Sequence, residues 1–320
     1  MKSKILVTGA GGFIGHHLVT YLKQNNFWVR GVDLEYPEFA KSDADEFQIL
    51  DLREWENCVK ATNGISEVYN LAADMGGIGY ITSHNASIAR NNILINTHML
   101  EASRLAKVEM FFFSSSACIY PTYKQVDSDA ISLRESDAYP ADPEEGYGWE
   151  KLYTEKLCEY YLHDYNLKTI VARFHNVYGP LGTFQGGKEK APAAICRKIS
   201  QAKSGDIIDI WGDGMQTRSF MYIDDCVEGI ARLVKSGNPG PLNLGMDSLV
   251  TINEMVSIVT EISGKKIKRA YQMDKPQGVR GRNSDNTLLK HILGWSPSTT
   301  LKEGLTTTYE WIDAQIYDQK

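Results

Sequence analysis

Three glycines at positions 9, 12 and 15 follow directly on a short apolar run at residues 4–7. The run is typical of a buried strand, and residues 13–24 after it have the apolar spacing of a helix. A strand that turns sharply into a helix, with a diphosphate approaching its backbone, needs glycine because a side chain would fill the space. The triplet therefore predicts the first strand–turn–helix unit of a dinucleotide-binding sheet.

Strand-like and helix-like segments alternate through the first half of the chain. Candidate strands cover residues 4–7, 28–32, 47–50, 67–71, 110–114 and 169–172, and candidate helices lie near 13–24, 52–61, 88–106 and 149–165. Unbroken apolar strands that alternate with helices predict a parallel sheet covered on both faces. We therefore expect an α/β fold with a Rossmann-type, doubly wound parallel sheet.

The pattern becomes irregular after Phe174, where glycines and a proline within 176–190 indicate a crossing into a second lobe. A strand and helix near 221–234 are expected to return to the main domain, and the final segment, 301–316, has helical spacing. We predict a dinucleotide-binding domain over residues 1–175, with a return segment near 221–246. A smaller C-terminal substrate-binding lobe is predicted from residues 176–220 and 247–320.

Two aspartates follow predicted strands near the glycine triplet. Asp33 ends the second strand roughly 20 residues after the glycines, where a carboxylate accepts hydrogen bonds from the ribose and repels a 2′-phosphate. This placement favours NAD over NADP; the alternative is an ordinary strand-end residue. Asp51 either meets the adenine amino group or caps the next helix. The predicted cofactor-binding residues are Gly9, Gly12, Phe13, Ile14, Gly15, Asp33, Asp51, Leu52, Tyr147 and Lys151.

Charge and cysteine usage exclude several classes of protein. The net charge is −6 and no long basic run occurs, which argues against a nucleic-acid partner. No apolar stretch approaches a membrane-spanning length, and the glycines come too early for a signal-peptide core. The five cysteines are scattered without a C-x-x-C pair. We expect reduced thiols, a cytoplasmic location and no metal site.

A tyrosine and a lysine, Tyr147 and Lys151, lie one helical turn apart. A phenol titrates near ~10, but a neighbouring ammonium and an oxidised nicotinamide favour the phenolate, which can then act as a base for a hydroxyl. Three serines, 114–116, end a predicted strand at the sheet edge where ligands bind. The pattern predicts a redox site at that edge.

At this point the sequence resembles the extended short-chain dehydrogenases. The matching segments are TGAGGFIG (8–15), NLAA (70–73), SSSACIY (114–120), Y-x-x-x-K (147–151) and NVYGP (176–180). The resemblance implies that Ser116, Tyr147 and Lys151 support hydride transfer with NAD. It also implies a homodimer formed through the helices at 88–106 and 149–165.

A finer resemblance is to the GDP-mannose 3,5-epimerase family. It rests on LAADMGGIGY (71–80), SSSACIYP (114–121), GGKEKAPAA (186–194), WGDGMQTRSF (211–220) and GVRGRNSDN (278–286). The resemblance implies conversion of the nucleotide sugar GDP-mannose to GDP-L-galactose, with GDP-L-gulose as a further candidate product. The route implied is transient C4 oxidation by bound NAD, enolate formation and re-reduction, with Cys118 and Lys190 as the acid/base pair.

This chemistry explains why two further side chains are needed. No protein base removes a proton from an unactivated sugar carbon, whereas a ketone at C4 makes the hydrogens on C3 and C5 acidic. Inversion then needs an acid/base group on each face of the ring. Cys118 lies two residues after Ser116, where the Lys151 charge and the cofactor are expected to favour its thiolate. Lys190 lies in a glycine-rich loop. The alternatives are a packing cysteine and a solvated lysine.

The same motifs predict the substrate contacts. Arg218, Arg282 and Lys198 are assigned to the pyrophosphate, although an isolated arginine usually forms a surface ion pair. The full substrate-binding prediction is Gly76, Ser116, Ala117, Cys118, Asn176, Glu189, Lys190, Ala191, Lys198, Gln216, Thr217, Arg218 and Arg282. Two other functions stay open: an NAD-dependent C4 or heptose epimerase for another nucleotide sugar, which needs no Cys118–Lys190 pair, and a non-catalytic NAD-binding module.

Overall fold

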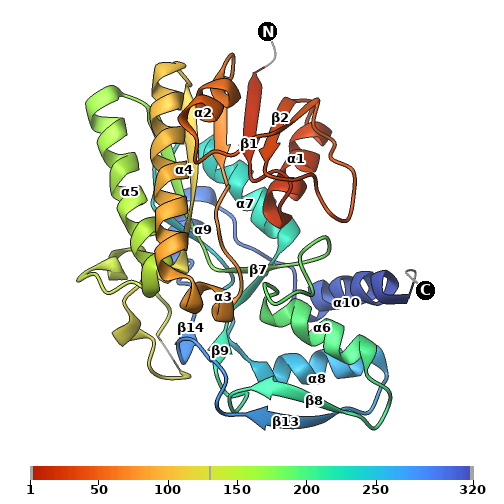
Figure 1. Ribbon diagram of the computed structural model, residues 1–320. Helices are drawn as coiled ribbons and strands as arrows, with labels where there is room; N and C mark the ends of the chain where they lie inside the picture. Colours follow the sequence, from red (N-terminus) through yellow and green to blue (C-terminus); the bar gives the residue numbers. More distant parts are fainter. Residues whose placement is uncertain (1–2, 130, 318–320) are drawn as a thin grey trace.

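A computed structural model describes residues 3–129 and 131–317 (Figure 1). Its largest sheet has the strand order β11-β6-β5-β4-β1-β2-β3, with every neighbouring pair parallel. The strands are β1 (Lys4–Thr8), β2 (Trp28–Asp33), β3 (Glu46–Ile49), β4 (Glu67–Asn70), β5 (Met110–Ser116), β6 (Lys168–Phe174) and β11 (Leu242–Leu244). The strand order changes direction between β1 and β4, the point at which such sheets bind ligands. The predicted Rossmann-type, doubly wound sheet is confirmed.

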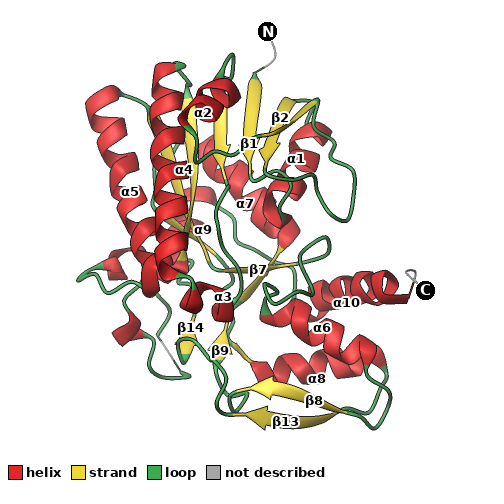
Figure 2. Cartoon of the chain, in the orientation of Figure 1, coloured by secondary structure: helices red, strands yellow, loops and turns green. Residues whose placement is uncertain are grey.

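Helices cover both faces of this sheet (Figure 2). On one face lie α1 (Phe13–Gln24), α7 (Ile223–Ser236) and α9 (Thr287–Leu293), and on the other lie α2 (Trp55–Thr62), α4 (Asn85–Leu105) and α5 (Glu145–Tyr165). Successive residues of β1 divide between the two layers, with Ile5 and Val7 in one hydrophobic core and Leu6 in the other. This alternation is why the predicted strands are apolar throughout.

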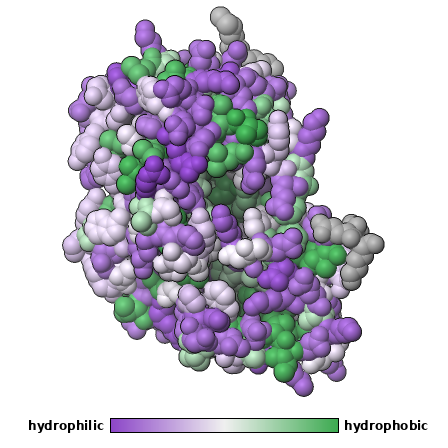
Figure 3. Space-filling model, in the orientation of Figure 1, coloured by the Kyte–Doolittle hydropathy of each residue, from purple (hydrophilic) through white to green (hydrophobic). Residues whose placement is uncertain are grey.

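A smaller lobe lies below the sheet in Figure 1. Its helices α6 (Ala191–Gln201), α8 (Ile252–Ser263) and α10 (Leu301–Tyr317) pack together beside the parallel pair β8 (Ile207–Trp211) and β13 (Lys268–Gln272). Short segments lie between the lobe and the sheet: α3 (Ile78–Ser83), η1 (Ala117–Ile119), β7 (Asn176–Tyr178), β9 (Thr217–Arg218), β10 (Phe220–Tyr222), β12 (Val250–Thr251) and β14 (Gly281–Arg282). Figure 3 shows a recess on this face between the two parts.

Two elements differ from the sequence prediction in ways that affect the site. Helix α5 begins at Glu145 rather than at 149, so Tyr147 lies in its first turn. The strand expected to return to the main sheet near residue 221 is β10, which instead pairs with β7. The return is made by α7, which packs beside α1, and by β11, which extends the sheet next to β6. The division into two domains remains a prediction.

None of the helices in the described residues is both long and apolar enough to cross a membrane.

Candidate active site

The glycine loop between β1 and α1 has the close backbone packing that the sequence predicts. Gly9 has φ +70°, and a Cβ at Gly15 would lie 2.0 Å from the Gly9 carbonyl oxygen. Gly12 is the N-cap of α1, and no side chain caps that helix. A Cβ on Gly12 would approach only the Gly9 oxygen, at 3.4 Å, so the amides of the first turn border open space. This cradle fits a dinucleotide pyrophosphate.

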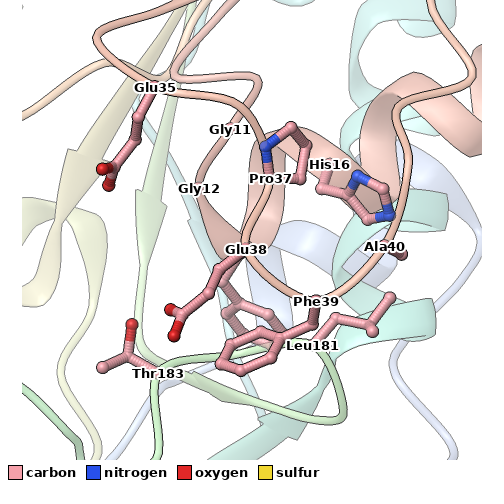
Figure 4. A pocket seen from close by; sticks show the side chains of 11 residues that line it. Gly11, Gly12, His16, Glu35, Pro37, Glu38, Phe39, Ala40, Leu181 and Thr183 are labelled. Carbon is pink, nitrogen blue, oxygen red and sulfur yellow. The ribbon is translucent and has the colours of Figure 1, made fainter.

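A cavity lies beside this loop, and Figure 4 shows the side chains around it. Residues 35–40 form its other wall and contribute the carboxylates of Glu35 and Glu38. Behind it, Asp33 accepts hydrogen bonds from the backbone N–H groups of Gly11 at 2.8 Å and Leu34 at 2.6 Å. Burial raises the pKa of Asp33, and those two N–H groups act against the rise. Acidic groups around the cavity disfavour the additional phosphate of NADP, so the cavity suits NAD better than NADP.

The second aspartate is already paired within the protein. Arg53 Nη2 lies 2.5 Å from Asp51 Oδ2, and this hydrogen bond lowers the pKa of the carboxyl group. The suggestion that Asp51 caps the next helix is wrong, because the N-cap of α2 is Glu54. Leu52 is buried in the core beneath α2. The predicted adenine contact of Asp51 therefore has to compete with Arg53.

Ser116, Tyr147 and Lys151 meet at the carboxyl end of β5. Lys151 Nζ donates to the Ser114 carbonyl at 3.0 Å and lies 5.5 Å from the centroid of the Tyr147 ring. Burial raises the pKa of Tyr147 well above its ordinary value, and the charges of Glu150 and Cys118 add to the rise. The lowering of this pKa that the sequence led us to expect from Lys151 is therefore not found in the protein alone. A phenolate here needs a further positive charge, such as that of an oxidised nicotinamide.

Cys118 lies in η1, directly after β5. Its backbone N–H donates to Ser116 Oγ at 3.2 Å, and Arg282 Nη1 approaches its sulfur to 3.5 Å. Burial and the Glu144 carboxylate raise the pKa of the thiol, whereas Arg282 lowers it. From the sequence, Lys151 is the cation expected to favour the thiolate. The structure shows Arg282 as the cation hydrogen-bonded to the sulfur.

Lys190 occupies the N-cap position of α6, in the loop that follows two glycines of positive φ. Burial lowers the pKa of its ammonium, and Cys118 acts in the opposite direction, so the two side chains are electrostatically coupled. The loop is attached to the segment before α3 because Gly77 N–H donates to the Lys188 carbonyl at 3.0 Å. Lys188 Nζ also lies 4.4 Å from the centroid of the Tyr80 ring. These contacts fix the loop that carries Lys190.

The two predicted arginines have different surroundings. Arg282 is paired within the protein, with Nη2 2.6 Å from Glu144 Oε2 and Nε 2.6 Å from Gln125 Oε1. Among the described residues, Arg218 donates only to backbone carbonyls, including that of Val279 at 2.6 Å. Burial, followed by the charge of Arg282, lowers the pKa of Arg218 to about 10. A buried guanidinium without a carboxylate hydrogen-bonded to it suits an anionic ligand such as a diphosphate.

The other predicted substrate residues divide into two groups. The first group lies on the short segments between the lobe and the sheet, or beside them, and consists of Gly76, Ala117, Asn176, Ala191, Gln216 and Thr217. Gln216 donates to the Trp211 carbonyl at 2.8 Å, while its Oε1 is buried without a partner and can accept from a ligand. By contrast, Glu189 pairs with Arg197 at 3.0 Å, and Lys198 donates to the Asp209 carbonyl at 2.7 Å. Both charges in this second group are already partnered by the protein.

Sequence reasoning missed four polar residues around the site. Glu144 and Gln125 hold Arg282, and Asn92 and Asn96 donate to the neighbour of Lys151, Glu150. None of them stands in a motif whose spacing indicates a ligand or a catalytic role. Their partners lie on other elements, so only the fold reveals them.

Comparison with known proteins places this geometry among related enzymes. The NAD dependent epimerase/dehydratase family matches residues 5–245. The chain is 50% identical over 319 residues to the GDP-mannose 3,5-epimerase of Arabidopsis thaliana, covering 99% of this chain and 84% of that enzyme. The UDP-glucose 4-epimerase of Thermotoga maritima, solved with UDP-glucose, has a TM-score of 0.88 at 28% identity, covering 98% of this chain and 99% of that one. The UDP-glucuronic acid 4-epimerase of Bacillus cereus, solved with UDP-glucuronic acid and NAD, has a TM-score of 0.83 at 27% identity, with 98% and 100% covered.

Proposed function

This chain belongs to the NAD-dependent epimerase/dehydratase family, and we propose that it is a GDP-mannose 3,5-epimerase. It inverts C3 and C5 of GDP-mannose, giving GDP-L-galactose. Half of its residues are identical to those of a GDP-mannose 3,5-epimerase over almost the whole chain. GDP-L-gulose, the product of inversion at C5 alone, is a second product of the same chemistry.

The observation that carries this proposal is the convergence of Cys118 and Lys190 beside Tyr147. The three residues come from η1, the start of α6 and the first turn of α5. Cys118 packs against the hydrophobic cluster that contains Tyr147, and its charge acts on the ammonium of Lys190. A simple C4 epimerase needs only the redox group, so a second acid/base pair supports chemistry at the neighbouring carbons.

The roles follow from the chemistry of a C4 ketone. When bound, NAD supplies an acceptor for the hydride of C4 and returns it at the end of the cycle. Tyr147 takes the proton of the C4 hydroxyl and later gives it back, and Ser116, which hydrogen-bonds to Tyr147, assists it. Cys118 and Lys190 then remove and deliver protons at C3 and C5 from opposite faces of the ring. Arg282 stabilises the thiolate form of Cys118 through its 3.5 Å contact.

The nucleotide end of the substrate is assigned to the buried polar groups between lobe and sheet. Arg218 is the best candidate for the diphosphate because its charge has no hydrogen-bonded carboxylate partner. The free oxygen of Gln216 accepts a hydrogen bond from the substrate. Arg282 is paired with Glu144 and contacts the sulfur of Cys118, so we assign it to Cys118 instead of to the pyrophosphate.

We also propose a homodimer in the cytoplasm. Helices α4 and α5 lie side by side on the outside of the molecule (Figure 1). Trp149, Tyr153 and Tyr160 on α5 are each more than half exposed, as is Leu105 on α4. Large aromatic side chains left exposed on one helix pair suit a self-complementary interface. Sedimentation of the purified protein tests this part of the proposal.

Solvent exchange tests the function directly. Purified protein incubated with GDP-mannose in heavy water should incorporate deuterium at C3 and C5, read by NMR. Cys118→Ala and Lys190→Ala each remove a group that contributes on the order of 10²–10⁴ in rate, while NAD and GDP-mannose binding should persist. A C4 epimerase shows no exchange at C3 or C5 even before mutation. Full activity in both variants would contradict the assigned acid/base roles.

A further inference from the structure

A buried carboxylate lies beside Lys151 and has no part in the chemistry described above. Glu150 on α5 is 1% exposed, and Lys151 Nζ lies 3.9 Å from its Oε1. Asn92 Nδ2 donates to Oε1 at 2.9 Å and Asn96 Nδ2 donates to Oε2 at 3.1 Å, both from α4. Each carboxylate oxygen thus has an amide donor, and the nearest charge of opposite sign is the Lys151 ammonium.

The amides that hold Glu150 are themselves fixed from the sheet. Asn70 on β4 donates to Asn96 Oδ1 at 2.9 Å, and Thr8 at the end of β1 donates to Asn70 Oδ1, also at 2.9 Å. Thr8 and Asn70 have no exposed surface, and Asn96 is 1% exposed. A continuous, sealed chain of hydrogen bonds therefore connects the start of the glycine loop to the neighbour of Lys151.

Burial brings the two charged groups toward the same proton affinity. It raises the pKa of Glu150 to about 7 and lowers the pKa of Lys151. The other titratable groups that act on the pair are Tyr147, Cys118, and Glu155 together with Cys158 further along α5. From α4 the neutral amides of Asn92 and Asn96 face Glu150. From β5 the Ser114 carbonyl and the uncharged Phe113 ring, whose centroid lies 4.8 Å from Nζ, face Lys151. Such a pair shares protons as a unit.

We propose that Glu150 is a positioning residue that exchanges a proton with Lys151 and thereby controls the protonation state of Tyr147. This inference rests on the proposed epimerase function. An N–H bond of the Lys151 ammonium breaks and an O–H bond forms on Glu150. The resulting amine then takes the phenolic proton of Tyr147, which leaves a phenolate, an ammonium and a neutral carboxylic acid. No electron is transferred in this step.

A proton that is kept away from solvent suits an enzyme whose reaction has no net oxidation. The proton that leaves the C4 hydroxyl has to return to the same oxygen within one turnover, so this proton needs no path to bulk water. Tyr147 is 7% exposed, and Lys151 and Glu150 are each 1% exposed. A dehydrogenase, by contrast, releases one proton per turnover and requires an exit for it.

Glu150→Gln tests the proposal because it keeps the size of the side chain and removes the proton acceptor. We expect kcat to fall on the order of 10²-fold with KM for GDP-mannose unchanged. In the unaltered enzyme, activity should decrease as the pH falls below about 7, because a protonated Glu150 accepts no proton. That limb should be missing in Glu150→Gln. Glu150→Asp, which restores a carboxylate, should recover the limb and part of kcat, and it decides the question if the glutamine variant does not fold.

Glu155→Gln is the matched control, a second buried carboxylate on α5 that forms an ion pair with Arg173 at 2.7 Å. It should lower Tm and leave the pH limb in place. Unchanged kcat and pH dependence in Glu150→Gln, no recovery in Glu150→Asp, or the same loss of the limb in Glu155→Gln would each overturn the inference.

Two measurements separate this inference from the proposed function. If the unaltered protein with bound NAD shows neither nicotinamide absorbance change nor solvent exchange with GDP-mannose, the proposed function fails. Infrared titration of the substrate-free protein tests the pair independently: the band of a buried carboxylic acid should titrate near neutral pH in the unaltered protein and vanish in Glu150→Gln. A titration identical in the two proteins would overturn the assignment of the proton to Glu150.

Discussion

For Gly148→Ala, the local sequence predicts a gain in protein stability, whereas the structure predicts a loss. In an exposed helix, alanine is more stable than glycine by about 1 kcal/mol. Gly148, however, follows Tyr147 in the first turn of α5, where the helix touches the loop that carries Cys118. A Cβ at this position would lie 2.3 Å from the Cys118 carbonyl oxygen and 2.9 Å from Pro143 Cβ.

The geometry gives the size of the effect. A carbon atom normally stays about 3.3 Å from a carbonyl oxygen, so α5 and the Cys118 loop would have to separate by about 1 Å. The same carbonyl accepts the Glu144 N–H at 2.8 Å, and that bond would be strained. Overpacking costs about 1–3 kcal/mol, which leaves a net destabilisation of about 0–2 kcal/mol after the gain in helix propensity. A displacement of about 1 Å between reacting groups costs on the order of 10² in rate.

Urea unfolding and deuterium exchange at C3 and C5 measure the two effects separately. Gly264→Ala is the control, because Gly264 has φ +65° with nothing within 4 Å of an added Cβ. It should cost about 1–2 kcal/mol of stability through backbone strain and leave exchange intact. A Gly148→Ala protein that is more stable and fully active would refute the close approach of α5 to the Cys118 loop.

Three further predictions concern the cofactor, the redox group and pH. Asp33→Ala should weaken NAD binding about 10–100-fold and reduce the discrimination against NADP, measured by titration of both; equal binding of the two by the unaltered protein would refute the assignment. Tyr147→Phe should bind NAD and remain folded, yet lose exchange at C3 and C5, so near-normal exchange would contradict its role. Burial lowers the pKa of His175 to about 3. Below about pH 6.5 this histidine therefore stays neutral in the folded protein, whereas it binds a proton in the unfolded chain. The stability that neutral His175 contributes is complete above about pH 6.5 and has fallen by about 1.4 kcal/mol at about pH 5.5. In urea unfolding over this pH range, the His175→Gln variant should therefore lose about 1.4 kcal/mol less stability than the unaltered protein. An equal loss in the two proteins would contradict the burial argument.

The fold was accessible from the sequence because its signals are local. Gly9 and Gly15 indicate the turn after β1, since the close backbone packing there excludes any other residue. Apolar runs that alternate with helical spacing indicate a parallel sheet covered on both faces. Boundaries were less accurate: α5 begins at Glu145. No local pattern marks that start, because its first turn packs against the Cys118 loop instead of being capped by a side chain.

The candidate site was only partly accessible in this way. Its motifs named Cys118 and Lys190 through a family resemblance, and Tyr147 and Lys151 through their helical spacing as well. The sequence does not contain the pairing of Arg282 with Glu144 and Cys118, because those partners are separated by 138 and 164 positions along the chain. The resemblance implies that Arg282 binds the pyrophosphate, which stays a prediction, while the structure pairs Arg282 with Glu144.

What the sequence determined by itself is the sheet, the glycine turn and the identities of the reactive groups. Local spacing and steric exclusion act over a few residues and need no partner elsewhere in the chain. What only the tertiary structure decided is the electrostatic environment of those groups, including the burial that raises the pKa of Tyr147 and the carboxylate of Glu150 beside Lys151. Burial and charge pairing depend on which distant segments meet, and the packing of α5 against both α4 and β5 brings these segments together.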